Sequence, residues 1–424
     1  MKILLINTYD KGGAAKACMR LYEGLLQQGI DARLLILFSK KSYPENGKIA
    51  VFSKQFPYMY EKPNLLKRFA LKAGMGKKTE RIKKEIEHIP KSQLELFTYP
   101  YTNYDITLHP WYKESDIINL HWTSGFLDYS FFSKNLKPVI WTLHDMNAFT
   151  GGCHYSQECY KFMEDCASCH YLRNTINPNF ARKLFKYKNH HLNNVPYLHI
   201  ACPSQWLAKI SHSSTLFKRF DHSVIPYGID TNIFKAYPKE VARKLFGLPL
   251  NKKILLFAAQ NIDNPRKGIN YIFDVIDRLK NNSDVIICAV GKANINKPYK
   301  NLLLLGEIDS EEKMAMAYNA SDALLIPSLE DNLPNTALES ILCGTPVIAF
   351  PVGGLLDIIN DEENGYLCPD ISSQSLTKKT IQFLENNVHL TRDQIRTQAV
   401  ANYDILISAN RYITLYKSIF QNKD

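Results

Sequence analysis

The sequence lacks any run of eighteen consecutive apolar residues, so it predicts no transmembrane helix. Its start, MKILLINTYD, has only a short apolar run before Asn7 and no small-residue cleavage site, which favours a buried strand over a signal peptide. Internal repeats and low-complexity segments do not stand out either. The 424 residues, 45% hydrophobic and 22% charged, are typical of a globular protein with two or three domains. We therefore expect a cytoplasmic globular protein.

Acidic residues are in the minority, and the formal net charge is +11. The segment from Lys62 to Lys91 contains ten Lys and Arg but only three Glu, and apolar residues recur there at helical spacing. This basic insert, within about 40–100, is either a solvated helical segment or a segment that docks on anionic lipid headgroups through residues 62–91. Docking would place the protein peripherally on the inner face of the cell membrane. A positive net charge is also typical of proteins that bind nucleic acid. No nucleic-acid recognition motif is present, so we expect no nucleic acid to bind.

Nine cysteines, an odd number without a secretory signal, predict reduced thiols. Four of them share the stretch FTGGCHYSQECYKFMEDCASCH with the spacing C-x5-C-x6-C-x2-C, namely Cys153, Cys159, Cys166 and Cys169. The last pair is typical of a zinc or iron–sulfur site, whereas the first gap is longer than usual. Three interpretations remain open: a structural zinc ion, with His154 or His170 able to replace a thiol; a loop of reduced or redox-active thiols; and a disulfide pair.

Two series of alternating strands and helices predict an α/β protein with two parallel sheets. The first series opens with the strand KILLIN, the glycine turn DKGGAAK, a helix over about 14–28 and the strand ARLLILF, and continues with DIINLHW and PVIWTLHD. The second series contains the strands KILLFAA, DVIICAV, NLLLLGE, DALLIPS and PVIAF. In such sheets, ligands bind at the carboxyl ends of the strands.

The predicted domains follow from these two series. An N-terminal Rossmann-like domain covers 1–230, including the basic insert and a cysteine-rich loop over 150–170. A second Rossmann-like domain covers 231–403. The two doubly wound domains are expected to face each other across a cleft, and the helix in 404–424 belongs to either of them, with a return to the N-terminal domain as one option.

The most informative stretch is IPSLEDNLPNTALESILCGTPVIAF, residues 326–350, which predicts a strand, a loop and a helix over about 335–343. Asp331 in the loop and Glu339 on the helix stand eight residues apart. The first helical turn offers free N–H groups for hydroxyls or phosphate. Carboxylates that accept hydrogen bonds from sugar hydroxyls, beside such donors, make a sugar-nucleotide pocket. A capped helix at the surface is the structural alternative.

This stretch resembles the E-x7-E region of family-four retaining glycosyltransferases, which share the GT-B fold. Asp331 stands where the first Glu is usual, and Asn332-Leu333-Pro334-Asn335 replaces a Gly-Phe-Gly-rich segment, which indicates a subgroup. The FTGGCHY loop is similar to a cysteine-bearing loop in bacterial transferases that assemble extracellular polysaccharide, capsule and lipopolysaccharide.

The resemblance implies an enzyme that moves a sugar from a nucleotide-diphosphate sugar to a hydroxyl of a growing surface glycan or a lipid-linked acceptor. It implies retention at the anomeric carbon and no cofactor for catalysis. The N-terminal domain would bind the acceptor and the C-terminal domain the donor. In NPRKGIN, Lys267 and Arg266 would neutralise the donor diphosphate, while Ile262 stands where the family usually has another Arg.

Further roles are carried over from the same resemblance. Glu339 would hold the nucleotide ribose, Asp331 the donor sugar, and His144, in TLHD, would face that sugar unless it is a core histidine. The residues expected to bind the donor are Gly12, Gly13, Arg266, Lys267, Asn332, Leu333, Pro334, Asn335 and Glu339; those expected to act in catalysis are His144, Lys267, Asp331 and Glu339.

Three other functions remain as alternatives. A sugar-nucleotide epimerase of the same fold would need no acceptor. A degenerate binding protein would take up the donor without turnover. A zinc-bearing nucleic-acid-binding protein would show salt-dependent binding to DNA or RNA.

Overall fold

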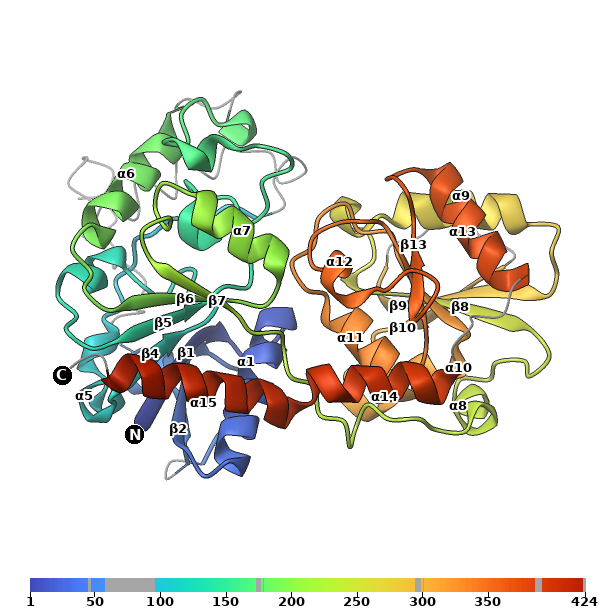
Figure 1. Ribbon diagram of the computed structural model, residues 1–424, viewed down its shortest axis with the longest axis horizontal. Helices are drawn as coiled ribbons and strands as arrows, with labels where there is room; N and C mark the ends of the chain where they lie inside the picture. The colour runs from blue at the N-terminus through green and yellow to red at the C-terminus, as the bar shows by residue number, and fades with distance from the viewer. Residues whose placement is uncertain are drawn as a thin grey trace. The chain divides into compact units, whose positions relative to one another are not determined.

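The computed structural model describes residues 1–44, 47–57, 96–172, 177, 179–293, 299, 301–385 and 391–421. The chain divides into two compact units (Figure 1). Unit 1 comprises Met1–Pro203, Leu207–Ile225 and Asn410–Asp424, and unit 2 comprises Ser204–Trp206 and Pro226–Ala409. Each unit is built on a parallel sheet, as the alternation of strands and helices predicts.

Seven strands form the sheet of unit 1 in the order β3-β2-β1-β4-β5-β6-β7. All side chains of β4 and β5 are buried, because helices cover both faces of a parallel sheet. The strand order reverses between β1 and β4, and the carboxyl ends of strands at such a reversal are where ligands bind. The strands are β1 (Lys2–Tyr9), β2 (Asp31–Phe38), β3 (Ile49–Val51), β4 (Ile117–Leu120), β5 (Val139–Thr142), β6 (Leu198–Cys202) and β7 (Asp221–Val224).

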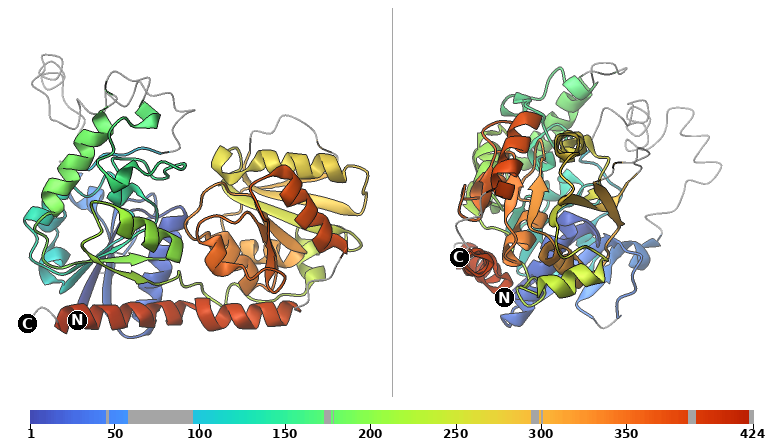
Figure 2. Two further views of the ribbon diagram at one scale, coloured as in Figure 1. Left: turned by 45° about the horizontal axis from the view of Figure 1, so that its top comes forward. Right: turned by 90° about the vertical axis from the view of Figure 1, so that its right-hand side faces the viewer.

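Helices α1 and α15 cover one face of this sheet, and α6 and α7 the other (Figures 1 and 2). The last helix of the chain packs through buried tyrosines: Tyr416 donates its hydroxyl to Asn119 Oδ1 at 2.6 Å, and the Tyr412 hydroxyl lies 3.0 Å from Thr142 Oγ1. The helices are α1 (Gly13–Gln27), α2 (Phe52–Gln55), α5 (Pro110–Glu114), α6 (Phe180–Leu192), α7 (Gln205–Ser213) and α15 (Ile405–Gln421).

The sheet of unit 2 has six parallel strands in the order β10-β9-β8-β11-β12-β13. The sequence predicts all of them except β13, which is only three residues long. Here the order reverses between β8 and β11, so the loops after these two strands lie next to each other. The strands are β8 (Lys253–Asn261), β9 (Val285–Lys292), β10 (Leu302–Gly306), β11 (Ala323–Ile326), β12 (Val347–Ala349) and β13 (Gly365–Leu367).

Helices also cover both faces of this second sheet. Helix α9 packs against α13, whereas α10 packs against α8 and α11, and α11 packs against α14 (Figure 1). The helices are α8 (Lys239–Leu245), α9 (Ile269–Leu279), α10 (Glu311–Ala320), α11 (Asn335–Leu342), α12 (Leu355–Ile358), α13 (Ser373–Glu385) and α14 (Arg392–Tyr403).

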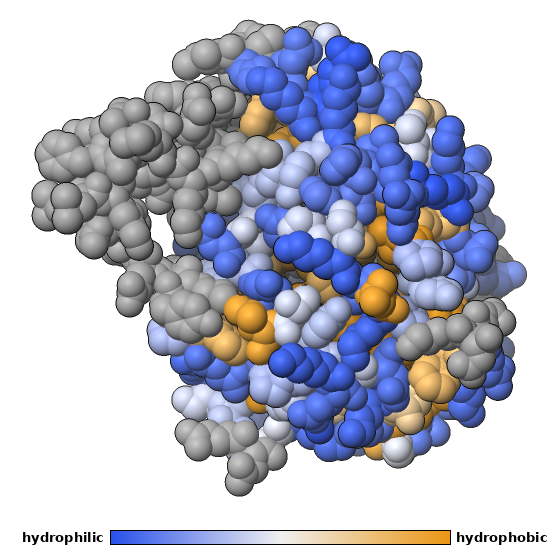
Figure 3. Space-filling model, turned by 90° about the vertical axis from the view of Figure 1, so that its left-hand side faces the viewer, coloured by the Kyte–Doolittle hydropathy of each residue, from blue (hydrophilic) through white to orange (hydrophobic). Residues whose placement is uncertain are grey.

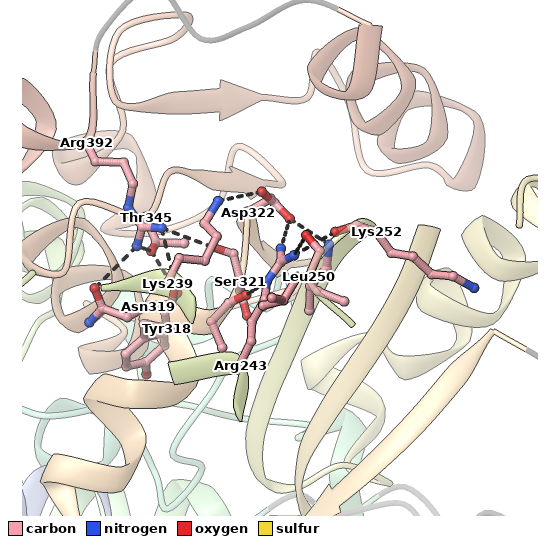
Figure 4. Close-up of polar contacts among 12 residues, drawn as sticks. Lys239, Arg243, Leu250, Lys252, Tyr318, Asn319, Ser321, Asp322, Thr345 and Arg392 are labelled. Atoms are coloured by element: carbon pink, nitrogen blue, oxygen red, sulfur yellow. Dashed lines mark hydrogen bonds and ion pairs between the residues drawn. The ribbon is translucent and has the colours of Figure 1, made fainter. Parts of the chain in front are cut away.

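A buried ion-pair network ties α8 to the turn between α10 and β11 (Figure 4). Arg243, 2% exposed, donates from Nη2 to Asp322 Oδ2 at 2.8 Å and from Nε to the Ala320 carbonyl at 3.0 Å. Lys239 Nζ lies 2.8 Å from the other oxygen of Asp322. Because a buried charge is costly unless it is paired, this network holds the helices of that face in one arrangement.

The end of the predicted first domain belongs to unit 2. The Ile229 amide donates to the Tyr403 carbonyl at 2.9 Å, and the Ile405 amide donates to the Ile229 carbonyl at 3.0 Å. Residues 226–230 therefore pair with the segment between α14 and α15, and are not part of the first domain as predicted. In α15 itself, residues up to Ala409 belong to unit 2 and those from Asn410 to unit 1.

The surface shows no single dominant apolar face in the view of Figure 3, where hydrophobic residues form small groups among hydrophilic ones. Among the described residues, no helix is both long and apolar enough to cross a membrane. The docking segment predicted at 62–91 lies outside the described residues, so membrane docking stays a prediction.

Candidate active site

The loop after β8 presents two cations at the carboxyl end of the sheet. The Asn264 side chain accepts from the Arg266 amide at 2.9 Å and starts a single 3₁₀ turn, Pro265–Lys267. Gly268 then takes a φ of 77°, and a Cβ there would lie 1.9 Å from the Pro327 carbonyl oxygen. Only glycine satisfies both conditions. The loop is thereby pressed against the end of β11, the strand that precedes Asp331.

Asp331 lies between the two predicted cations. Lys267 Nζ is 2.5 Å from Asp331 Oδ2, and Arg266 Nη1 is 3.7 Å from the same oxygen. Burial raises the pKa of Asp331, but Lys267 and Arg266 outweigh burial and hold the pKa below its ordinary value of 3.8. The carboxylate is therefore charged at neutral pH, and the cluster carries one net positive charge, which suits an anionic ligand.

The loop from Asp331 to the start of α11 is closely packed. Gly353 has a φ of 55°, and a Cβ there would lie 1.6 Å from the Asp331 carbonyl oxygen. The Gly354 amide donates to the Asn332 carbonyl at 2.6 Å. Leu333 is buried at 4% exposure, while Pro334 precedes the first helical residue, Asn335. Pro334 makes no side-chain cap bond to this first turn, and the Ala337 amide donates to the Pro334 carbonyl at 3.0 Å.

Glu339 lies on α11 as predicted and is 2% exposed. Its Oε2 accepts from the Tyr318 hydroxyl at 2.8 Å. Tyr318 is held in turn, because Thr345 Oγ1 donates to its carbonyl at 2.8 Å and Arg392 donates to that Oγ1 at 2.6 Å (Figure 4). Tyr318 was not predicted from the sequence, because nothing in the local pattern links it to a carboxylate 21 residues away.

The glycine turn of unit 1 leads directly into α1. Gly12 precedes the helix with a φ of 96°, a value that favours glycine, and Gly13 is the first helical residue. The first turn of α1 contains no acidic residue. The turn therefore presents backbone N–H groups at the carboxyl end of β1, as the glycine motif predicts.

Two histidines meet at the carboxyl ends of β4 and β5. His121 Nδ1 and His144 Nε2 are 3.0 Å apart and both rings are buried. Burial lowers the pKa of His144 to about 4, although Asp145 acts in the opposite direction. Burial and the neighbouring His144 hold the pKa of His121 well below 6.5. Both rings are neutral at pH 7, so one nitrogen of the pair donates and the other accepts.

Asp145 connects this pair of strands to the cysteine-rich loop. Its Oδ2 lies 2.6 Å from His154 Nδ1 and accepts from Trp122 Nε1 at 2.7 Å. Burial raises the pKa of Asp145, but His154 and the hydrogen bonds outweigh burial and lower it below 3.8. His154 Nε2 is 2.9 Å from Thr98 Oγ1. Because both of its ring nitrogens are engaged, His154 does not replace a thiol, which corrects one option of the zinc interpretation.

All four clustered cysteines line one small cavity, whose wall also includes Phe97, Phe162 and His170. None of the four forms a disulfide. Within the described residues, no three His, Cys, Asp or Glu side chains lie close enough together, as they stand, to hold one metal ion. The spacing thus brings the predicted thiols to one place, while zinc itself stays a prediction.

Comparisons with known proteins agree with this architecture. Residues 238–401 match the family model described as Glycosyl transferases group 1. The fold is similar over 100% of both chains to a sucrose-phosphate synthase from Thermosynechococcus elongatus, with a TM-score of 0.68 at 18% identity. HepE from Anabaena, solved in complex with UDP-glucose, has a TM-score of 0.61 at 17% identity over 99% of this chain and 100% of HepE.

Curated relatives align over shorter regions. A D-inositol 3-phosphate glycosyltransferase from Thermobispora bispora is 30% identical over 164 residues, 34% of this chain and 38% of the relative. A phosphatidyl-myo-inositol mannosyltransferase from Mycobacterium leprae is 25% identical over 205 residues, 46% of this chain and 53% of the relative. The chain thus spans about a third to a half of the length of the relatives it matches. The match to the group 1 family model is thus confined to residues 238–401, and the similar solved structures show a GT-B fold.

Proposed function

We propose that this chain is a retaining glycosyltransferase that moves a sugar from a nucleotide-diphosphate sugar to a hydroxyl of its acceptor. The observation that carries the proposal is the cluster of Lys267, Arg266 and Asp331 beside the N-terminus of α11. A net positive cluster at the N-terminus of a helix is suited to a diphosphate that bears a sugar. The cluster also lies inside the region that matches the family model.

Each group has a distinct part in the proposed transfer. Lys267 and Arg266 meet the diphosphate and stabilise the charge that grows on it as the sugar departs. Asp331 and the backbone that follows it accept from and donate to the hydroxyls of the donor sugar. Glu339 accepts from the hydroxyls of the nucleotide ribose, with Tyr318 holding the carboxylate in place. Catalysis then comes mostly from positioning and electrostatic stabilisation.

Unit 1 holds the other residues predicted to meet the donor, His144, Gly12 and Gly13. In its predicted role, His144 faces the donor sugar as a neutral imidazole. Gly12 and Gly13 let the backbone approach a phosphate or the acceptor. In the proposed mechanism the leaving phosphate accepts the proton of the incoming hydroxyl on the same face of the sugar. This order of steps retains the anomeric configuration of the sugar and needs no catalytic metal.

We infer that the acceptor is a growing surface glycan or a lipid-linked molecule. One matched relative bears the name of an enzyme that acts on phosphatidyl-myo-inositol, and a WaaG of similar fold is described as involved in lipopolysaccharide biosynthesis. The net charge of +11 suits the inner face of an anionic membrane. The basic segment over 62–91 is the proposed contact with that surface.

A panel of nucleotide sugars tests the proposal. A bound donor raises the melting temperature of the protein by mass action, so the panel identifies the nucleotide and the sugar. The matching donor should then lose its sugar to an added glycan or lipid acceptor. An epimerised donor formed without any acceptor would instead indicate a sugar-nucleotide epimerase, and stabilisation without any product would indicate a non-catalytic binding protein.

A further inference from the structure

The loop over 150–170 gathers four thiols that the proposed transfer does not use. Cys153, Cys159, Cys166 and Cys169 come from three separate turns of this loop and all reach the wall of the same small cavity. The loop is anchored from outside, because Phe97 pairs with Cys153 in an antiparallel bridge. Four thiols around one cavity match the ligand number and type of a structural tetrahedral metal site.

Backbone donors are aimed at two of the sulfurs. The Gly151 amide donates to Cys166 Sγ at 3.2 Å. The Tyr171 amide, two residues after Cys169, donates to the sulfur of Cys169. These hydrogen bonds act against burial, which raises the pKa of both thiols, and metal binding itself displaces the thiol protons. Groups that orient and hydrogen-bond the ligands are a regular feature of metal sites.

A buried lysine supplies an independent argument. Lys188 on α6 has no solvent exposure, donates from Nζ to the Asn147 carbonyl and lies 5.1 Å from the centre of the Tyr129 ring. Within the described residues it forms no ion pair with a carboxylate, and its electrostatic neighbours are Cys166, Cys153 and Asp145. A buried cation needs negative charge nearby. Four thiolates around a divalent cation carry a net charge of about −2 and would add to the charge of Asp145.

We propose that Cys153, Cys159, Cys166 and Cys169 bind one soft divalent metal ion, zinc in the cell. Thiolate ligands select zinc over hard cations such as magnesium or calcium. Within the described residues no three of these side chains lie close enough together, as they stand, to hold one metal ion, so the proposed site requires the four sulfurs to turn from the cavity wall toward its centre. The inference is independent of the proposed transferase activity.

The ion would brace the loop that carries His154. Four non-glycine residues of this loop have a positive φ, namely Gln157 (46°), Glu158 (64°), Cys166 (55°) and Ser168 (49°). Such conformations are costly and persist only where the surroundings enforce them. With the loop fixed, His154 stays paired with Asp145, which follows His144 directly. Metal binding thereby holds the ends of β4 and β5 in place.

Metal analysis of the purified full chain gives the first test. Protein prepared with zinc and then desalted should contain about one zinc ion per chain. After removal of zinc with a chelator, titration with cobalt(II) should produce an intense near-ultraviolet band from sulfur-to-cobalt charge transfer and visible bands typical of tetrahedral coordination. Cys166→Ser with Cys169→Ser should abolish both signals. Cys202→Ser, a buried cysteine of the same unit outside the cavity, should leave them unchanged.

Lys188→Met tests the charge argument separately. Loss of the buried cation should weaken zinc binding at least tenfold in competition with a chromophoric chelator. If the double serine variant fails to fold, the chelator-treated wild-type protein decides the question alone. The proposal is overturned if this protein stays folded by circular dichroism and takes up neither zinc nor cobalt. It is equally overturned if mass spectrometry of the native protein shows two hydrogens lost per cysteine pair, the sign of disulfides.

Discussion

Glu339→Gln is the substitution that most sharply separates a binding role from a structural role. Gln keeps the size of the side chain and an acceptor oxygen for the Tyr318 hydroxyl, which now lies 2.8 Å from the carboxylate. The fold of unit 2 should therefore survive. The ribose, in contrast, loses a charged acceptor, and a hydrogen bond to a charged group contributes about 1.5–3 kcal/mol. Nucleotide affinity should fall by roughly 10- to 150-fold.

Isothermal calorimetry with the nucleoside diphosphate of the identified donor measures this loss. Tyr318→Phe is the matched control, because it removes the donor to Glu339 and leaves the carboxylate available to the ribose. It should weaken nucleotide binding by about threefold or less while lowering the stability of unit 2 by about 1 kcal/mol. A folded Glu339→Gln variant that binds the nucleotide within twofold of wild type would refute the assignment.

The other predictions concern charge, loop fit, pH and membranes. Lys267→Ala should lower kcat by roughly 10²–10³ with a smaller effect on donor binding, because the cation acts on charge that grows as the sugar departs; equal losses in both would contradict this. Asp331→Glu should lower turnover although it restores the family's usual residue, because the 2.5 Å contact with Lys267 leaves no room for a longer side chain; higher turnover would refute that reasoning. The pKa of His144 is about 4 in the folded protein, against 6.5 for an exposed histidine of the unfolded chain. As the pH falls below 6.5, the unfolded chain therefore binds a proton that the folded protein does not bind. The free energy of unfolding should drop by roughly 2 kcal/mol between pH 7 and pH 5. Urea unfolding of His144→Gln should show a correspondingly smaller drop, and an equal drop would exclude His144 as the cause. The segment over 62–91 is tested by co-sedimentation: the protein should bind anionic vesicles at low salt and be released at high salt. A variant in which Glu replaces Lys77, Lys78, Lys83 and Lys84 should not bind.

Strands with continuous apolar runs were predictable from the sequence, as was the helix that carries Glu339. Long strands such as β8 and β9 contain unbroken apolar segments, ILLFAA and VIICAV, and Gly344, with a φ of 75°, follows α11 as its position predicts. Strand β7, with the sequence DHSV, was not predicted, because half-buried polar side chains give no apolar pattern. Strand β13 was also not predicted, because its residues GYL begin with glycine and form no apolar run like that of the equally short β12.

The candidate site was predictable where its residues are close in sequence or follow a motif. Lys267, Asp331 and Glu339 fall in such motifs, and the structure pairs the first two directly. Contacts between distant segments left no local signal. Lys188 illustrates this: a lysine on an amphipathic helix is normally expected at the surface, but this one is buried and its Nζ contacts the Asn147 carbonyl and the Tyr129 ring.

The central claim is sugar transfer with retention, and the configuration of the product tests it most directly. The donor found by the nucleotide-sugar panel is incubated with the protein and an acceptor, and the new glycosidic linkage is examined by proton NMR through the coupling constant of its anomeric proton. We expect a linkage with the same anomeric configuration as the donor sugar, and no linkage with the Lys267→Ala and Glu339→Gln double variant. A product of inverted configuration, or a linkage that the double variant forms at the wild-type rate, would contradict it.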